Sequence, residues 1–367
     1  MRNLQSKVLV AGASGLVGYA AARHFLASPG WQVVGISRRV PQGLERARIV
    51  SVDLLDAAKC AEVFGGMGDV THVVYAALYE KPGLIAGWRE RDQMEINLRM
   101  LRNLFDPLVA TAKGLQHVTL LQGTKAYGSH IEPVPVPARE RLPRHPHENF
   151  YWLQEDYLRD KQRGTSWHWT VLRPQVIFGE SLGSPMNEIP AIGVYGAILK
   201  EAGEPLYYPG GPYGRIFEAV DADLLARACA WAATSPACRN ETFNINNGEP
   251  FEWRTVWPAI ADALGMSPGP ARPMSLAVEM PKRQDEWTAI VRKYRLRSPE
   301  SLEEFVGQSF IYADRGFAHG LAGSPAPTLV STVKARLAGF HDCVDTEEMF
   351  RRLFRRFQEL RWLPPRS

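Results

Sequence analysis

Hydrophobic residues in the first half of the chain form short runs separated by stretches of helical periodicity. The runs, rich in Val, Ile and Leu, occupy residues 8–10, 31–36, 49–52, 70–76, 118–122 and 169–173. Between them, apolar positions at helical spacing predict helices, clearest at residues 19–26, 94–110 and 151–163. Buried strands alternating with helices predict an α/β fold with a doubly wound parallel sheet and right-handed crossovers.

The pattern changes after residue 179, where Gly, Pro and Tyr become dense through residues 183–213. Residues 191–200 still have helical spacing, and residues 242–246 alternate like a late strand. From about residue 251 the chain is mostly helical in pattern and rich in Trp and Phe. Because 367 residues exceed one compact core, a second and smaller lobe is expected.

Three glycines interrupt the chain where the first strand gives way to the first helix, with the spacing G-x-x-G-x-x-G. Without a Cβ they allow a tight turn, the approach of backbone N–H groups to a pyrophosphate, and close helix–strand packing. A plain turn is the alternative, but this position favours a dinucleotide site of the Rossmann type. The expected cofactor contacts in this turn are Gly12, Ser14, Gly15, Leu16, Val17 and Gly18.

The end of the second strand indicates which dinucleotide binds. Ser37, Arg38 and Arg39 lie about twenty residues after the last glycine, where an NAD site would carry an acid for the ribose hydroxyls. Two guanidiniums and a hydroxyl can hold a 2′-phosphate, so NADP(H) is predicted, with a solvated basic loop as the alternative. Asp53, beside Leu54, follows the third run at the usual place for an adenine contact, and is otherwise a surface acid.

The two parts of the chain are therefore expected to have different tasks. Residues 1–179 are predicted to form an NADP-binding Rossmann domain to which residues 215–246 return. Residues 180–214 and 247–367 are predicted to form a discontinuous, mainly helical substrate-binding lobe. Aromatic residues of the tail supply either its core or an apolar pocket, and core is the commoner fate of such spacings; they are Trp253, Trp287, Phe305, Phe310 and Tyr312.

Charge and cysteine content exclude several other classes of protein. The net charge of +4 comes from 43 basic and 39 acidic residues, and the arginines at 351–352 and 355–356 alternate with apolar residues like the wet face of an amphipathic helix. Nucleic-acid binding is therefore not expected. Four widely spaced cysteines indicate neither a metal site nor a disulfide framework. With no signal peptide and no apolar run of membrane length, a cytoplasmic protein without a membrane partner is expected.

Polar residues at the ends of the later strands are the candidates for catalysis. Short-chain dehydrogenases commonly place a Lys four residues after a Tyr, where its charge lowers the pKa of the phenol. Here Glu155 stands four residues after Tyr151, whereas Lys125 follows the fifth strand, where a Ser or Thr is usual. We interpret Glu155 and Asp156 as ordinary acids in the first turn of a helix.

These residues resemble the motifs of the progesterone 5β-reductase and iridoid synthase-like (PRISE) enzymes, an atypical branch of the short-chain dehydrogenase/reductases. The resemblance covers nearly the whole chain, up to residues 344–346, and the exchanged positions of Lys and Tyr make it specific. The matching motifs are at residues 12–18, 37–39, 71–75, 97–104, 121–127, 149–151 and 169–179.

The resemblance implies NADPH-dependent reduction of the C=C bond of an α,β-unsaturated carbonyl compound, with Lys125 and Tyr151 as the catalytic pair. Tyr151 would donate a hydrogen bond to the enolate oxygen, and Lys125 would lie close enough to orient it. Two departures from the family, Trp152 and the loop at residues 79–82, are expected to touch the substrate. Further cofactor contacts are expected at Ala76, Gln122, Thr124, Lys125, Tyr151, Pro174 and Val176.

Two other functions fit the same fold. A carbonyl reductase or nucleotide-sugar-modifying enzyme would act at a C–O bond, but the missing Y-x-x-x-K argues against it. A non-enzymatic NADP(H) sensor would need no Lys and Tyr pair. The expected partner is therefore a small enone or enal, and a homodimer is compatible with the sequence.

Overall fold

Seven parallel strands form the centre of the computed structural model, which describes residues 6–38, 41, 43–211, 214–323 and 325–366. Their spatial order is β10-β6-β5-β4-β1-β2-β3. The strands are β1 (Ser6–Ala11), β2 (Trp31–Ile36), β3 (Arg48–Val50), β4 (His72–Tyr75), β5 (His117–Leu121), β6 (His168–Pro174) and β10 (Glu241–Ile245). Each of the predicted strand runs lies in this sheet, which confirms the doubly wound α/β prediction.

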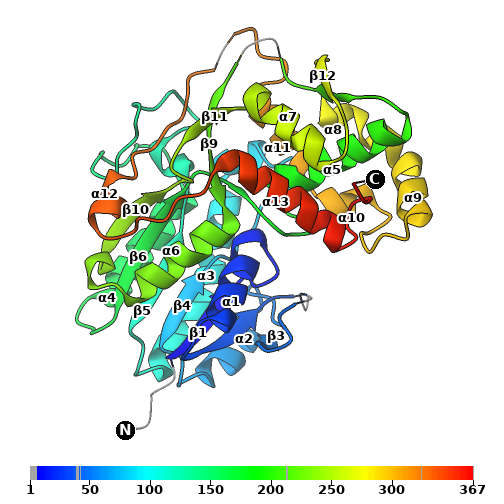
Figure 1. Cartoon of the computed structure of the whole chain (residues 1–367). Coiled ribbons are helices and arrows are strands. Elements are labelled where there is room, and N and C mark those ends of the chain that lie inside the picture. The colour runs from blue at the N-terminus through cyan, green and yellow to red at the C-terminus, as the bar shows by residue number, and fades with distance from the viewer. Residues whose placement is uncertain (1–5, 39–40, 42, 212–213, 324, 367) are drawn as a thin grey trace.

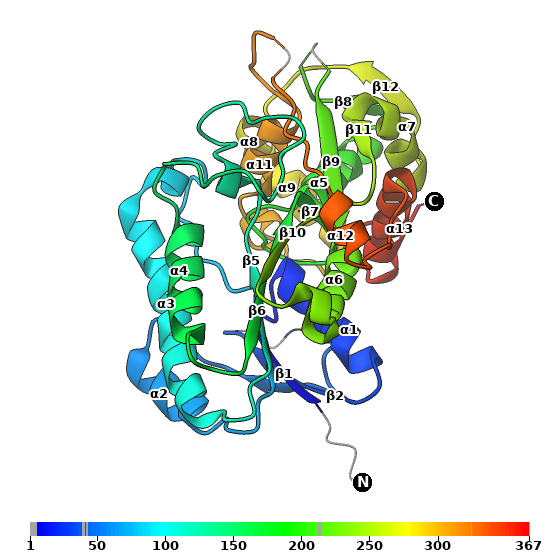
Figure 2. The same cartoon turned by 90° about the vertical axis from the view of Figure 1, so that its left-hand side faces the viewer.

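Helices cover both faces of the sheet, as Figure 2 shows. The helices of one face are α2 (Ala57–Gly65), α3 (Arg91–Thr111) and α4 (Phe150–Gln162). Those of the other are α1 (Leu16–Ala27) and α6 (Ala222–Thr234). Separate apolar cores fill the two layers between sheet and helices. This double covering explains why the strands read as nearly continuous apolar runs and not as alternating ones.

The chain reverses direction across the sheet between β1 and β4, because β2 and β3 lie on one side of β1 and β4 lies on the other. Such a switch point opens a crevice at the carboxyl ends of the strands. Gly12, directly after β1, has φ +80°, and a Cβ on Gly18 would lie 2.1 Å from the carbonyl oxygen of Gly12. Helix α1 can therefore approach the turn only with glycine at that position.

Most of the remaining elements lie beyond the end of the sheet that is far from the N-terminus (Figure 1). The exceptions include α12 (Val333–Leu337), which packs against β10, and the short turn η3 (Pro236–Cys238), which packs against α6 and β10. Two small sheets contain β7 (Val176–Phe178), β9 (Ile216–Asp221) and β11 (Pro250–Glu252), and β8 (Leu206–Tyr208) and β12 (Pro268–Ala271). The helices are α5 (Glu188–Glu201), α7 (Trp253–Ala263), α8 (Leu276–Glu279), α9 (Gln284–Lys293), α10 (Leu302–Val306), α11 (Ser309–Gly316), α12 (Val333–Leu337) and α13 (Thr346–Glu359). Short 3₁₀ turns are η1 (Ala86–Arg89), η2 (Thr124–Tyr127), η3 (Pro236–Cys238) and η4 (Pro281–Arg283).

Helix α5 is the central helix of this part of the molecule. It is buried from Glu188 to Leu199, which agrees with its apolar residues on every side. The aromatic residues of the tail pack around it as core, and Trp287 stacks on Phe305 with ring centroids 5.2 Å apart. Of the five aromatics singled out in the sequence, Tyr312 alone lines a cavity.

The predicted amphipathic helix near the C-terminus is α13, whose apolar side packs into the core and whose arginines face outward. One of these arginines, Arg356, and Arg23 of α1 both bind the buried carboxylate of Glu180, at 3.0 and 3.2 Å. Tyr19 donates a third hydrogen bond to Glu180. This carboxylate therefore joins α13 to the helix that follows the glycine turn. Among the described residues, no helix has both the length and the apolar character to cross a membrane.

Removing this carboxylate should destabilise the fold. We expect Glu180→Ala to lower the free energy of unfolding by about 2 kcal/mol, because two partly buried guanidiniums and a phenol lose their shared partner. Urea denaturation measures the change. The control is Glu62→Ala, which removes an exposed pair with Lys59 and should cost less than about 0.5 kcal/mol. Equal losses in the two variants would contradict the role of Glu180.

Candidate active site

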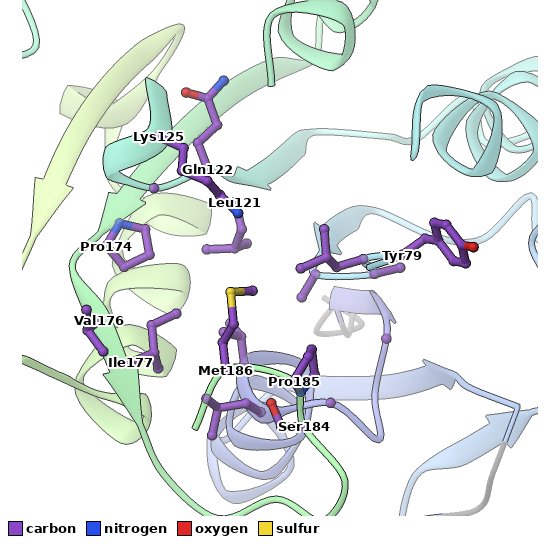
Figure 3. Close-up of a pocket in the computed structure, with 18 of the residues that line it drawn as sticks. Tyr79, Leu121, Gln122, Lys125, Pro174, Val176, Ile177, Ser184, Pro185 and Met186 are labelled. Atoms are coloured by element: carbon purple, nitrogen blue, oxygen red, sulfur yellow. The ribbon is translucent and has the colours of Figure 1, made fainter. Parts of the chain in front are cut away.

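A cavity of about 490 Å³ runs along the carboxyl ends of the sheet strands (Figure 3). Its walls are the glycine turn, the ends of β4, β5 and β6, the residues that follow β7, the start of β9, and α11. Gly18 does not line the cavity, and Arg39 lies outside the described residues. The predicted site residues that do line it are Gly12, Ser14, Gly15, Leu16, Val17, Ser37, Arg38, Asp53, Leu54, Ala76, Gln122, Thr124, Lys125, Tyr151, Pro174 and Val176.

The glycine end of the cavity has room and hydrogen-bond donors for a dinucleotide. Gly15 caps α1 without any side-chain hydrogen bond, so the first N–H groups of the helix are open to an anion. A Cβ on Gly12 would lie 2.8 Å from the carbonyl oxygen of Ala76, across the crevice. Ser37, hydrogen-bonded to Ser14 at 2.6 Å, and Arg38 line the same end. The residues present therefore fit a dinucleotide with a 2′-phosphate.

Gln122 lines the cavity, but its side-chain amide forms hydrogen bonds with residues of other elements. In Figure 3 the amide points away from the middle of the cavity. Its Nε2 donates to the carbonyl oxygen of Tyr151 at 3.2 Å and to Glu155 at 2.9 Å, and its Oε1 accepts from Arg173 at 2.8 Å. The side chain thus joins the ends of β5 and β6 to helix α4.

Tyr151 lies in the first turn of α4 and is 7% exposed. Burial raises the pKa of its phenol well above the usual value, and the nearby carboxylate of Glu80 raises it further. At neutral pH the hydroxyl therefore keeps its proton and can act as a hydrogen-bond donor. A Cβ on Gly123 would lie 3.4 Å from this hydroxyl, so the glycine leaves the space beside it clear.

Lys125 lies in η2, directly after β5, and its nearest partners come from another loop. Its Nζ is 3.5 Å from Oε1 of Glu80 and 4.0 Å from the centre of the Trp88 ring. Burial lowers the pKa of this ammonium, which Glu80 opposes and Arg315 reinforces. Within the described chain, no hydrogen bond joins Lys125 to Tyr151. Glu80 couples the two groups electrostatically, because its negative charge raises the pKa of Lys125 and that of Tyr151.

Asn149 ties the segments of Lys125 and Tyr151 together. Its Oδ1 accepts from the backbone N–H of Tyr151 at 3.0 Å, and its Nδ2 donates to the carbonyl oxygen of Lys125 at 3.1 Å. The same Nδ2 is 3.1 Å from Nε2 of His147, which continues to His145 at 2.8 Å. One N-cap side chain therefore sets the start of α4 against η2.

Two expectations from the sequence are wrong. Helix α4 begins at Phe150, so Glu155 and Asp156 lie in its second turn and not in its first. Glu155 is 2% exposed and contacts three arginines, with N–O distances of 2.7 to 3.7 Å; they are Arg144, Arg159 and Arg173. Burial opposes its ionisation, but the hydrogen bonds from Gln122 and Arg144 prevail and hold its pKa below the usual range.

The second error concerns Trp152, which was expected to touch the substrate. It packs between the guanidiniums of Arg144 and Arg173, at 4.7 and 5.4 Å from its ring, and does not line the cavity. Both arginines also bind Glu155, so Trp152 packs beside the ion pairs of that carboxylate. The other departure, Tyr79, does line the cavity, and the next residue of that loop is the partner of Lys125.

Several polar residues of the cavity were not found from the sequence. They come from segments far apart in the chain and belong to no local motif; His130, Glu188, Arg215 and Arg315 line the cavity, and Glu80 contacts Lys125 in its wall. For Glu80, the expectation that its loop touches the substrate was the available signal. For the other four residues the sequence offered no signal, because only folding brings them to the same cavity.

Comparisons with known proteins agree with this geometry. The (S)-8-oxocitronellyl enol synthase of Antirrhinum majus is 30% identical over 382 residues, which covers 98% of this chain and 93% of the relative. The 3-oxo-Delta(4,5)-steroid 5-beta-reductase of Arabidopsis thaliana is 32% identical over 325 residues, or 83% and 81% of the two chains.

A solved structure shares the fold of this chain, and a family model identifies its family. The UDP-glucose 4-epimerase of Thermotoga maritima superposes with a TM-score of 0.66 at 17% identity, covering 96% of this chain and 99% of the epimerase, a likeness in fold alone. Residues 47–321 match the model of the PRISE-like Rossmann-fold domain. With that match and relatives of 30% identity over nearly its full length, the chain belongs to the PRISE-like Rossmann-fold family.

Proposed function

We propose that the protein reduces the C=C bond of α,β-unsaturated carbonyl compounds with NADPH. The observation that carries the proposal is the buried hydroxyl of Tyr151, which lies in the same cavity as the glycine turn and whose pKa is raised by burial. The protein is an oxidoreductase, as are relatives named for enol synthesis and for steroid 5β-reduction. Arg38 at the rim of the nucleotide end, together with the absence of an acid after β2, favours NADP(H) over NAD(H).

The two parts of the fold are proposed to divide the work. The sheet and its helices, residues 1–179 with 215–246, would hold the nucleotide through Gly12, Gly15, Ser37 and Arg38. The part built from residues 180–214 and 247–367 would hold the substrate. Both contribute walls to the same cavity, which supports this division.

The chemistry needs a group that stabilises negative charge on oxygen. When bound, NADPH would supply a hydride to the β-carbon of the substrate, and the electrons of the C=C bond would then move onto the carbonyl oxygen as an enolate. The enolate oxygen then needs a donor, and the hydroxyl of Tyr151 supplies one that needs no prior proton uptake. A proton taken from solvent water at the α-carbon would complete the saturated carbonyl compound.

Lys125 is proposed to act on the same oxygen through its charge. Its ammonium lies over the face of the Trp88 ring and forms a long ion pair, of 3.5 Å, with the carboxylate of Glu80. Because the ammonium is buried, where water screens charges poorly, a new negative charge nearby is stabilised more than it would be in water. Asn149 would keep the two catalytic segments in register through its bonds to both.

Loss of Arg38 should weaken NADPH binding selectively. We expect Arg38→Ala to raise the Kd for NADPH about tenfold or more and to change that for NADH much less, because only NADPH carries the 2′-phosphate. Fluorescence titration with both nucleotides measures the ratio. Arg91→Ala, which removes an exposed arginine of α3, is the control and should leave the ratio unchanged. An unaltered preference in Arg38→Ala and in the double variant with Arg39→Ala would refute the assignment.

Loss of the Tyr151 hydroxyl should affect turnover and spare the nucleotide. We expect Tyr151→Phe to reduce kcat for an enone on the order of 10²-fold while NADPH binding persists. Lys125→Ala should also reduce kcat, and the double variant should lose less than the product of the two losses, because both residues act on one oxygen.

The matched control is Tyr157→Phe on the same helix, whose hydroxyl donates to Asp106 outside the cavity. NADPH oxidation and product analysis with a panel of enones and enals measure the effects. Near-parental turnover of Tyr151→Phe on every accepted enone would show that the phenol is not the donor.

Glu80 should control the alkaline limit of activity. Its charge raises the pKa values of both Lys125 and Tyr151, so its removal lowers both. We therefore expect the alkaline limb of the kcat/KM profile to move to lower pH in Glu80→Gln, whichever of the two groups must stay protonated. Glu95→Gln, an exposed residue paired with Arg91, should not move it. A limb that stays in place or moves to higher pH would contradict this account.

A further inference from the structure

Two arginines face the cavity from the part of the molecule opposite the glycine turn. Arg215 precedes β9 and Arg315 lies at the end of α11; both are partly buried and line the cavity. Nη1 of Arg215 donates to the backbone carbonyl oxygen of Arg315 at 2.8 Å, so the two residues are adjacent although they are 100 positions apart. This contact fixes one guanidinium beside the backbone of the other.

No carboxylate in the described chain comes within ion-pair distance of either guanidinium. The Nε of Arg215 is buried without a hydrogen-bond partner in that same part of the chain, and Arg315 contacts the Trp88 ring at 5.3 Å. Burial and the neighbouring Arg315 lower the pKa of Arg215, but a guanidinium stays charged in proteins. Two like charges therefore share one wall of the cavity, and this arrangement is unfavourable unless an anion joins them.

Glu188, whose charge acts on Arg215 electrostatically, forms no ion pair with it among the described residues. It is fully buried at the start of α5, and neither of its carboxyl oxygens has a hydrogen-bond partner among the described residues. A Cβ on Gly316 would lie 2.8 Å from its Oε1, so the carboxyl is tightly enclosed. Burial raises its pKa to about 8, which leaves it mostly neutral at neutral pH. The charge of Arg215 thus remains available to a ligand.

The arginines lie near the proposed reaction centre. Lys125 and Arg315 contact the same Trp88 ring, at 4.0 and 5.3 Å from its centroid, so their charged ends are less than ~10 Å apart. Tyr312, also in the cavity wall, is within electrostatic range of Tyr151 and of both arginines. One molecule in the cavity can therefore present a carbonyl to Tyr151 and another group to the arginines.

We infer that Arg215 and Arg315 form an anion subsite, and that the substrates this enzyme prefers are α,β-unsaturated carbonyl compounds that also carry a carboxylate. This inference rests on the proposed reduction and narrows its substrate class. Planar guanidiniums bind an oxyanion through paired N–H groups, a chemistry that a carboxylate and a diphosphate share. A carboxylate is favoured because it can belong to the same small molecule as the reacting carbonyl.

The test compares straight-chain 2-enals that end in a carboxylate with their methyl esters, in a series of increasing chain length, using the full chain and NADPH. We expect the best carboxylate to exceed its ester in kcat/KM by about tenfold or more, a preference that declines as NaCl is raised. Arg215→Gln and Arg315→Gln should each lower this acid-to-ester ratio by about tenfold, and the lysine variants should retain part of it. Arg292→Gln, an exposed arginine paired with Glu300, should keep the parental ratio.

A binding measurement separates this inference from the proposed function. Saturated dicarboxylates, inorganic phosphate and uridine diphosphate are titrated into the NADPH-loaded protein and followed by tryptophan fluorescence. Arginine-dependent binding of a dicarboxylate supports the subsite even if no enal is reduced, in which case the proposed reduction fails alone.

Three results would overturn the subsite. The first is reduction of acids and esters with equal kcat/KM by the parent enzyme. The second is an acid-to-ester ratio unaffected in both glutamine variants while NADPH binding stays intact. The third is arginine-dependent binding of uridine diphosphate without binding of any carboxylate, which would assign the arginines to a nucleotide ligand.

Discussion

The placement of Tyr151 depends on one buried carboxylate, that of Glu155. An ionised carboxyl that is 2% exposed is stable only with its hydrogen bonds satisfied, and Gln122 and three arginines satisfy them. Because Gln122 belongs to the end of β5 and Arg173 to β6, the carboxylate holds α4 against the carboxyl ends of two strands. The same Gln122 also binds the carbonyl oxygen of Tyr151. The phenol is thereby fixed at the edge of the sheet where a ligand binds.

The position that carries a lysine in common short-chain dehydrogenases thus has a structural task in this chain. A lysine one helical turn after Tyr151 would lower the pKa of the phenol and prepare it for proton transfer at an alcohol or ketone. Here the turn holds an anion that faces away from the cavity, and the phenol stays desolvated with a raised pKa. Cationic charge reaches the cavity from Lys125, Arg215 and Arg315. This distribution suits a donor that stabilises an oxyanion.

Local pattern was sufficient for the sheet and the glycine turn. Strand runs, helix periodicity and the three glycines act over a few residues, so the amino-acid sequence alone could assign Gly12, Ser37 and Lys125 to one site. Glu155 was misjudged because its burial comes from three arginines on other elements, which no local pattern indicates. Arg215 and Arg315 were missed for the same reason, since their contact spans 100 positions. Trp152 was expected to touch the substrate but does not line the cavity, because the residue next to a catalytic one in a helix points in another direction.

The most direct test of the account follows the hydride itself. The enzyme is supplied with NADPH that carries deuterium at the transferable position of the nicotinamide, and the product of an accepted enone is analysed by NMR. The account predicts a saturated carbonyl product with deuterium on the β-carbon. Deuterium on the carbon that bears the oxygen, in an allylic alcohol whose C=C bond is intact, would contradict it and indicate a carbonyl reductase.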